Sequence, residues 1–314
     1  MFEAEGSSKE VAGRLSFLQA QLLLHLTVLV WGLTAILGKL ITLPALCLVF
    51  YRQVLASLGI LVIAGWDQLR VDRSKVAPLM LGGVIIALHW SLFFASVHSN
   101  GVAISVICLS AGSLVTSLCE PWMMCKRWDP WDSVGGLLAV IGVVLVVGTT
   151  GGQDGLAPVS STGLLLGLGS AFFGGLFSAH NGRYVPHYSD YQISFWQLVW
   201  GSAAIGTVVL FLPHQWAAPW NFGWLNWCCL LVLAFLCTTL PWIWSAKILR
   251  TLNPFTMQLA VNLEPVYSML IAYLWFPKTE RLPSTFYCGS AGILGLIFAH
   301  QWWTRRRVSP QLLS

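Results

Sequence analysis

Charged side chains are scarce in this sequence. Asp, Glu, Lys and Arg make up 9% of the 314 residues, whereas a soluble domain carries about 25%. The hydrophobic set reaches 56%, and the mean hydropathy is +0.72. This composition excludes a soluble fold and indicates an integral membrane protein surrounded by a lipid bilayer. The net charge of +5 then reflects Lys and Arg at the membrane edges, so nucleic acid is not an expected partner.

Patterns for metals, disulfides and cofactors are also lacking. The eight cysteines form no CxxC pair and no Cys/His ligand spacing, and nearly all fall inside apolar segments. We expect them to be buried thiols that pack as small hydrophobes. The many glycines form no phosphate-binding loop. The sequence therefore predicts neither a metal site nor a cofactor.

Catalytic motifs are equally scarce. GxSxG and HExxH are absent, and Ser110, Ser113 and Ser117 have no nearby His. The alternative to a transport function is an intramembrane hydrolase using membrane-embedded Ser, His and Glu. Such an enzyme would need a Ser with a basic partner at midplane, and only His89 offers one. We therefore do not expect an enzyme.

Long apolar runs dominate the chain instead. Ten of them approach the roughly 20 residues that a membrane-spanning helix needs. They lie at 20–38, 44–64, 77–97, 101–124, 132–150, 161–180, 191–211, 225–246, 254–276 and 285–303. We predict an all-α polytopic protein of ten transmembrane helices. The first run follows a polar leader without a small-residue cleavage site, so we expect a retained helix and not a signal peptide.

A single Gly/Pro/Ser-rich linker separates two halves of five segments. An odd number of spans per half gives the halves opposite orientations, which predicts inverted repeats. A shift of 153 residues lays Asn100 on Asn253 and Gly112 on Pro265. The predicted units are a leader (1–19), a first repeat (20–150), a periplasmic linker (151–160), a second repeat (161–303) and a basic tail (304–314).

The basic residues predict the orientation. With the N-terminus inside, thirteen Lys and Arg residues fall in the cytoplasm, whereas Lys39, Lys278 and Arg281 fall outside and Arg52 lies within a helix. Cytoplasmic loops carry this excess of Lys and Arg. We therefore expect both termini on the cytoplasmic side of a bacterial inner membrane.

The stretch 253–280 carries the most unusual chemistry. Glu264 and Pro265 stand near the middle of an apolar segment, where a carboxylate costs about 3 kcal/mol. Gln258 and Asn262 share one helical face, and Glu264 and Tyr267 share another. This distribution predicts a central helix beside a polar cavity. The alternative is a structural Glu satisfied by a neighbouring hydroxyl or backbone group.

Arg52 and His89 lie at a depth similar to that of Glu264. Arg52 is roughly 8 residues, or about 12 Å, inside its segment, and Glu264 is about 15 Å from the opposite surface. We expect Arg52 and Glu264 to interact, directly or through substrate. The alternatives are a snorkelling Arg52 and a hydrogen-bonded core role for His89.

Two further groups of residues receive predicted roles. Glu120 and Pro121 lie near Lys126 and Arg127, so we expect a structural or gating role for them. Many of the 17 Trp residues form interface belts. Deeper ones, including Trp31 and Trp196, are candidates to line a site for a flat or amphipathic metabolite.

Several motifs together resemble the EamA-type family of the drug/metabolite transporter superfamily. These are NLEPVYSMLIAYLWFPKTE, Trp31-Gly32, Phe50-Tyr51-Arg52 and the run ALHWSLFFASVHSNGVAISVICLSAGSLVTSLCEP, which is similar to one bacterial branch. The sequence departs from the general family pattern at Ser110-Ala111-Gly112, which replace a proline that matches Pro265. The resemblance implies ten helices in two repeats and a transport function.

We therefore predict a secondary active transporter, with outward transport favoured over inward. It would carry a small, amphipathic metabolite by alternating access around a midplane cavity lined by the second, third, fourth, seventh and ninth segments. Glu264 and His89 are the candidate proton carriers, and the substrate's own gradient is the alternative source of energy. The sequence is compatible with either a monomer or a homodimer.

Overall fold

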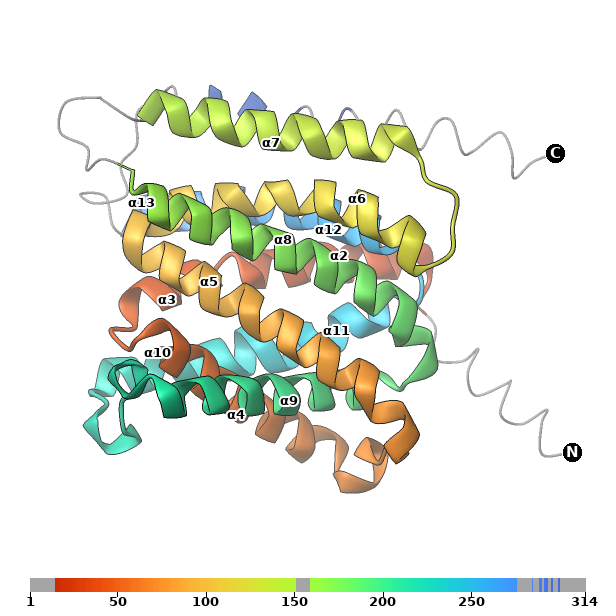
Figure 1. Cartoon of the computed structure of the whole chain (residues 1–314), viewed down its shortest axis with the longest axis vertical. Coiled ribbons are helices and arrows are strands. Elements are labelled where there is room, and N and C mark those ends of the chain that lie inside the picture. The colour runs from red at the N-terminus through yellow and green to blue at the C-terminus, as the bar shows by residue number, and fades with distance from the viewer. Residues whose placement is uncertain are drawn as a thin grey trace, which may run out of the picture.

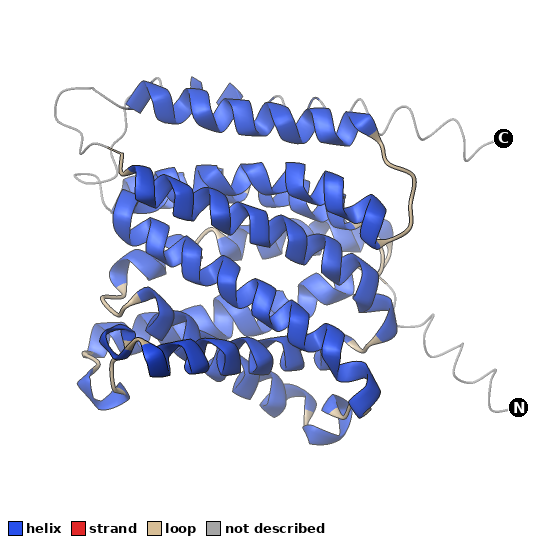
Figure 2. Cartoon of the chain, viewed as in Figure 1, coloured by secondary structure: helices blue, strands red, loops and turns tan. Residues whose placement is uncertain are grey.

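The computed structural model describes residues 15–150 and 159–275, together with isolated positions between 284 and 299. Every regular element in this part of the chain is helical (Figure 2), which confirms the all-α prediction there. The helices lie side by side in a bundle, with α7 along one edge (Figure 1). Residues 1–14 of the predicted leader, most of the linker, nearly all of the predicted tenth segment and the tail lie outside the described residues.

The helices follow the predicted apolar segments closely. They are α2 (Phe17–Trp31), α3 (Thr34–Leu40), α4 (Ala45–Ala64), α5 (Val76–Cys108), α6 (Gly112–Met123), α7 (Pro130–Thr150), α8 (Ser161–Tyr184), α9 (Asp190–Phe211), α10 (Trp224–Leu231), α11 (Leu240–Ile248), α12 (Pro254–Val261) and α13 (Glu264–Trp275). Six described ranges are long and apolar enough to span a bilayer. The count of ten spans stays a prediction.

Helix starts follow local capping chemistry. Ser16 and Ser189 each form a capping box with a glutamine three residues later, at the start of α2 and α9. The serine hydroxyl accepts an amide hydrogen bond that the first turn would otherwise lack. These polar residues mark the points where apolar helices begin.

The predicted third and fourth segments form one helical range, Arg73–Met123. Gly101 has φ of 78° inside α5, so the chain turns there without a conventional loop. Only glycine adopts this left-handed conformation readily. In place of the break that we expected at residues 98–100, the helix kinks at Gly101.

In the part of the chain that the structure describes, four membrane helices are interrupted near the middle of the bundle. Gly32 and Leu33 separate α2 from α3, and Asn262 and Leu263 separate α12 from α13. A 3₁₀ turn, η3 (Leu109–Ala111), separates α5 from α6, and a π-helical segment, η7 (Val232–Thr239), separates α10 from α11. Adding the predicted shift of 153 places Leu109 on Asn262, so η3 and the break between α12 and α13 lie at equivalent positions of the two halves.

A residue of α13 satisfies the backbone at the break after Trp31. Ser268 Oγ donates a hydrogen bond of 2.9 Å to the carbonyl of Gly32. A Cβ atom at Gly32 would lie 2.8 Å from Tyr267 Cβ, so this approach requires glycine. Interrupted helices persist in membranes only where neighbouring elements satisfy the freed backbone groups. The contact therefore joins the first predicted segment, in the first half of the chain, to the ninth predicted segment, in the second half.

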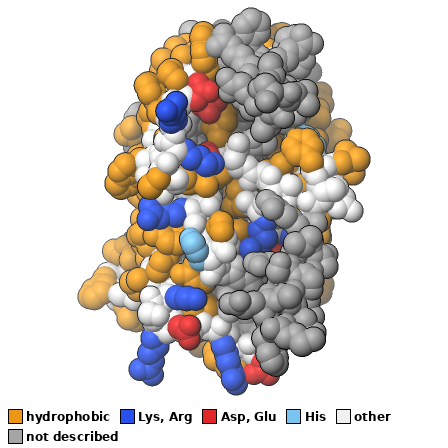
Figure 3. Space-filling view, turned by 90° about the vertical axis from the view of Figure 1, so that its right-hand side faces the viewer, with side chains coloured by type: hydrophobic (Ala, Val, Ile, Leu, Met, Phe, Trp, Pro, Cys, Tyr) orange, Lys and Arg blue, Asp and Glu red, His pale blue; other side chains and the backbone are white. Residues whose placement is uncertain are grey.

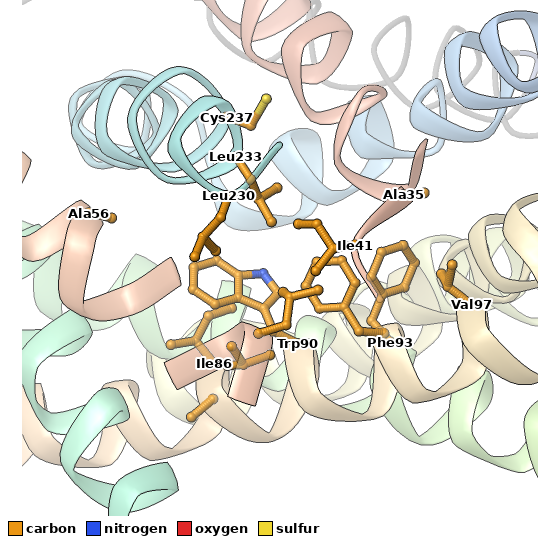
Figure 4. Packing of buried hydrophobic residues seen from close by; sticks show 14 of the residues in the cluster. Ala35, Ile41, Ala56, Ile86, Trp90, Phe93, Val97, Leu230, Leu233 and Cys237 are labelled. Atoms are coloured by element: carbon orange, nitrogen blue, oxygen red, sulfur yellow. The ribbon is translucent and has the colours of Figure 1, made fainter. Parts of the chain in front are cut away.

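Two apolar clusters hold the bundle together. The larger lies among α3, α4, α5, α9 and α10, and Figure 4 shows Trp90 and Phe93 of α5 directed toward Ile41, Leu230 and Leu233. The smaller includes Leu24 of α2 and Met257 of α12. α5 packs closely against α8 and α9 and contributes residues to both clusters.

The two ends of the bundle differ in charge. The connections 65–75, 124–129 and 185–189 lie at the right-hand end in Figure 1. Figure 3 views this end and shows Lys and Arg side chains gathered on it. The orientation that we derived from the sequence assigns this end to the cytoplasm.

Candidate functional site

A cavity lies where the interrupted helices meet. Its volume is about 100 Å³, and because one water needs about 10–15 Å³ on this scale, the cavity has room for a small molecule. Side chains from α2, α3, α4, α5 and η3 line it on one side, and side chains from α8, α11, α12 and α13 line it on the other. The cavity therefore forms between the two halves of the chain.

Arg52 lies in this cavity on α4 and is 1% exposed. Its Nε donates to Thr238 Oγ1 at 2.7 Å, and its guanidinium carbon lies 3.9 Å from the centroid of the Trp90 ring. The hydroxyl of Thr238 in turn donates to the carbonyl of Leu233, 2.7 Å away. The π-helical segment thus orients the guanidinium toward the cavity, and the alternative of a snorkelling Arg52 does not hold in this structure.

His89 lines the cavity from α5. Its Nδ1 lies 2.8 Å from the carbonyl of Ser170, which can only accept, so Nδ1 carries the hydrogen. The Ser170 hydroxyl donates to the His89 carbonyl at 3.0 Å. This reciprocal contact orients the ring and leaves Nε2 as the nitrogen for a bound molecule or a proton.

Glu264 begins α13 and is 6% exposed. It lines the same cavity as Arg52 and His89, and Gln258 adds an amide from α12. A carboxylate in the first turn of a helix is favoured by the helix dipole. Among the described residues, no ion pair joins Glu264 to Arg52, so their predicted interaction stays a prediction.

Pro265 occupies a different place from the one we expected. A continuous helix over 254–276 would put this proline in its interior, but α12 ends at Val261 and α13 starts at Glu264. Pro265 therefore stands in a first turn, where its missing N–H costs little. The interruption, and not a kink in one helix, accommodates the Glu-Pro pair.

Glu120 lies away from the cavity, on α6. One carboxylate oxygen, Oε1, lies 3.2 Å from Lys126 Nζ, and the other accepts a hydrogen bond of 2.9 Å from the amide of Phe255. Phe255 is in the first turn of α12, so Glu120 supplies that helix with a cap from another element. Pro121 follows it within α6.

The structure corrects the predicted role of the seventh segment. None of the described cavity residues comes from α9, because α9 packs directly on α5, where a Cβ at Gly83 would lie 2.8 Å from Gly201 N. Trp196 of α9 lies at the basic end and donates to the carbonyl of Leu69 at 2.7 Å. Trp31 lies in the cavity lining.

Two other predicted residues lie beside the cavity without lining it. Tyr267 packs against Gly32. Asn262 stands in the break between α12 and α13, is 2% exposed, and neither of its amide atoms has a hydrogen-bond partner in the described part of the chain. Tyr267 therefore lies at the break between α2 and α3, and Asn262 lies at the break between α12 and α13; neither is part of the cavity wall.

The structure adds polar residues that the sequence analysis missed. Ser178 and Asn181 of α8 and Ser245 of α11 line the cavity, and Thr238 holds Arg52. The signal was present as polar residues in apolar runs, as in SAHN and the two threonines before Leu240-Pro241. In the described residues, no group of three or more His, Cys, Asp and Glu could hold a metal ion.

Comparisons with known proteins bear on the identity of the chain. A search of curated proteins gave no match. One solved structure, described as "Crystal structure of protein", matches 93% of this chain and 100% of its own with a TM-score of 0.69 and 17% identity, which shows a shared fold. The family described as "EamA-like transporter family" matches residues 18–148 and 161–300, one range in each half, and confirms the resemblance seen in the sequence. The chain therefore belongs to the EamA-like transporter family.

Proposed function

We propose that this protein is a secondary transporter that carries a small metabolite by alternating access around the central cavity. The observation that carries this proposal is the convergence of Arg52, His89 and Glu264 on a cavity bounded by interrupted helices. Discontinuous helices and a site between two repeats are typical of secondary transporters. Aromatic lining by Trp31, Trp90 and Trp242 suits a molecule with a flat or apolar part.

The position of the cavity supports an inward-open conformation. Its lining extends to Leu249 and Met257, at the ends of α11 and α12 beside the basic connections. Toward the other end, a Cβ at Gly38 would lie 2.3 Å from the Phe94 ring, and His98 Nε2 lies 3.2 Å from the Gly38 carbonyl. A cavity loaded from the cytoplasm fits the proposed outward direction of transport.

Gating then involves movement of α12 relative to α6 and α8. Glu120 caps α12 from α6, and Ser178 Oγ donates to the carbonyl of Pro254 at 3.3 Å. A Cβ at Gly182 would lie 2.0 Å from the Pro254 ring, so α8 meets α12 closely there. We infer that Glu120 holds the cytoplasmic end of α12 in this conformation.

Proton coupling is the proposed source of energy, and Glu264 and His89 are the proposed carriers. Both line the cavity, and His89 presents one ring nitrogen that its contact with Ser170 leaves available. Facilitated movement down the substrate's own gradient is the second candidate. We place the protein in a bacterial inner membrane with both termini cytoplasmic, as a monomer or a homodimer.

An intramembrane hydrolase is not supported by the geometry. Ser170 contacts His89 through its hydroxyl, which lies 3.0 Å from Nδ1. That serine is 0% exposed, and its hydroxyl donates to the His89 carbonyl. A nucleophile must reach its substrate from the cavity, so this pair serves to position the ring.

Purified protein in liposomes tests the proposed function. The vesicles are incubated with a mixture of metabolites, with and without a pH gradient, and their contents are identified by mass spectrometry. We expect saturable accumulation of a small set of molecules, absent from empty vesicles and strongly reduced in Glu264→Gln. Equal contents in protein-containing and empty vesicles, or hydrolysed products, would contradict the proposal.

A further inference from the structure

The guanidinium of Arg52 has donors that the protein does not use. Its Nε is bound to Thr238, but Nη1 is buried and has no hydrogen-bond partner among the residues that the structure describes. The side chain is 1% exposed and lines the cavity. A buried, charged donor without an acceptor is costly, so this group points to a missing ligand.

The surroundings of Arg52 determine which edge of the guanidinium is available. Trp90 covers one face of the planar group at 3.9 Å, and Thr238 occupies the Nε side. The end formed by the two Nη groups remains for an acceptor. Planar guanidinium ends bind carboxylates through paired hydrogen bonds, with more geometric specificity than a lysine provides.

Charge in the cavity favours a single negative charge on the ligand. Arg52 is the one Lys or Arg among the described residues that line the cavity, and Glu264 contributes a carboxyl group to the same space. A doubly charged phosphate would bring excess negative charge into a site of low polarity. When Glu264 is protonated, one ligand carboxylate matches the one guanidinium.

The rest of the lining suits an apolar body attached to that carboxylate. Trp90 packs on Trp242 with ring centroids 4.9 Å apart, and Trp242 stacks on Phe177 at 5.2 Å with an interplanar angle of 22°. Phe93 completes this aromatic wall. A flat or branched apolar group would lie against these rings while its carboxylate meets Arg52.

We propose that the cavity binds a small organic monocarboxylate, and that the free Nη end of Arg52 is its anion-binding group. The proposal rests on the proposed transport function and names the substrate class of that site. Thr238 and Trp90 act as positioning residues, because they hold the guanidinium and do not meet the carboxylate themselves.

Three probes of similar size and different charge test the proposal by direct binding. Benzoate, benzamide and benzylamine are titrated calorimetrically into the full-length protein in lipid nanodiscs. We expect benzoate to bind at least about tenfold more tightly than benzamide, the ratio expected when a charge-assisted hydrogen bond is lost. Benzylamine should bind more weakly still.

Variants locate the effect at Arg52. Arg52→Gln should remove the preference for benzoate, Arg52→Lys should retain part of it, and Arg70→Gln, which removes an exposed guanidinium outside the cavity, should leave it unchanged. Equal binding of benzoate and benzamide to the unaltered protein would overturn the proposal, as would tightest binding of benzylamine or no binding of any probe. The comparison of the three probes on the unaltered protein does not depend on whether an Arg52 variant folds.

The result is separate from that of the transport assay. Benzoate binding without flux of any carboxylate would contradict the proposed function and leave the anion site in place. Flux of molecules without a carboxylate, together with equal probe binding, would keep the transporter and reject the substrate class.

Discussion

Arg52 retains its charge in the interior because neighbouring groups replace part of its hydration. Insertion scales put the cost of an arginine at the centre of a membrane at about 2.5–3.5 kcal/mol. A hydrogen bond to a charged group contributes about 1.5–3 kcal/mol, and Thr238 supplies one. The face of Trp90 adds a cation–π contact. The remaining donors therefore stay available for a ligand.

The first prediction concerns Arg52 and Glu264 together. Glu264→Gln keeps the side-chain shape but removes the carboxylate that shares the cavity with Arg52. We expect transport to fall at least about tenfold, the change produced by about 1.4 kcal/mol. Removing one partner of a buried charge pair costs about 3–5 kcal/mol, so the folded yield should fall too.

Size-exclusion chromatography of the single and double variants measures this coupling. Arg52→Gln should reduce yield like Glu264→Gln, and the double replacement should restore yield without restoring transport. A double variant no better folded than the worse single variant would show that the two charges do not interact. Glu264 would then be a lone group held by its own surroundings.

The second prediction separates the two contacts of Glu120. Glu120→Ala removes the acceptor of the Phe255 amide, and loss of a helix cap costs about 0.5–2 kcal/mol. Glu120→Gln keeps an oxygen for that amide and loses the contact with Lys126, which is part-exposed and contributes about 0–1 kcal/mol. In thermal unfolding in detergent, Glu120→Gln should therefore have a higher melting temperature than Glu120→Ala.

Lys126→Gln is the matched control, because it removes the ion pair alone. Its melting temperature should lie close to that of Glu120→Gln. Equal damage from Glu120→Gln and Glu120→Ala would mean that the charge, and not the cap on α12, is the stabilising feature.

At the scale of elements, the π-helical segment η7 positions Arg52. The hydroxyls of Thr238 and Thr239 donate to the carbonyls five residues earlier, Leu233 and Ala234, at 2.7 and 3.0 Å. Pro241 supplies no amide to the turn before it, which leaves room for a wider turn. π-helical insertions occur often at functional sites. Here the insertion turns Thr238 toward α4.

The third prediction tests this segment. Thr238→Val keeps the shape but leaves Arg52 Nε without its acceptor, so we expect a loss of about 1–3 kcal/mol of stability. Thr238→Ser keeps the hydroxyl and should restore most of it. Thr207→Val is the control, because that threonine is exposed on α9 and bonds only within its own helix.

Thermal unfolding of the three variants gives the comparison. The Thr207 change should stay within about 0.5 kcal/mol of the unaltered protein. If Thr238→Val has the same melting temperature as Thr207→Val, the hydrogen bond to Arg52 contributes nothing measurable to stability. η7 would then stabilise the bundle through packing alone.

At the scale of the whole molecule, the distribution of charge predicts the orientation. The end of the bundle in Figure 3 carries Lys and Arg side chains, and such residues collect on the cytoplasmic side. The connection between α9 and α10, at residues 212–223, lies at the opposite end (Figure 1). The predicted orientation of the whole chain therefore rests on a few loop residues.

The fourth prediction is read from reporter fusions. A reporter active only in the periplasm should be active when fused after Gln215 and silent when fused after Arg127. The reverse pattern would contradict the orientation. It would also reverse the proposed direction of the open cavity.

The fifth prediction concerns energy coupling. If Glu264 or His89 carries a proton, the transport rate in liposomes should depend on the pH gradient and collapse when a protonophore is added. His89→Gln should remove the dependence if His89 is the carrier. Similar flux in both directions without a gradient would instead identify a facilitator, and both residues would serve binding or packing.

The sequence alone determined the class, the halves and the central charges. Membrane insertion depends on the composition of each segment, so hydropathy predicts the helices segment by segment. A charge inside such a segment is costly whatever its partners, so Arg52 and Glu264 stand out without a structure. The EamA-type resemblance rested on motifs that are likewise local.

Only the tertiary structure decided which side chains surround the cavity. The contact between Arg52 and Thr238 joins residues 186 positions apart, and that between Ser268 and Gly32 joins residues 236 apart. Periodicity cannot pair such residues. Depth within its segment favoured Trp196 as a lining residue, but Trp196 lies at the basic end, and α9 packs directly on α5 and contributes none of the described cavity residues. At the interruption after Trp31, Ser268 of a neighbouring helix satisfies the freed carbonyl of Gly32, which no single segment can do for itself.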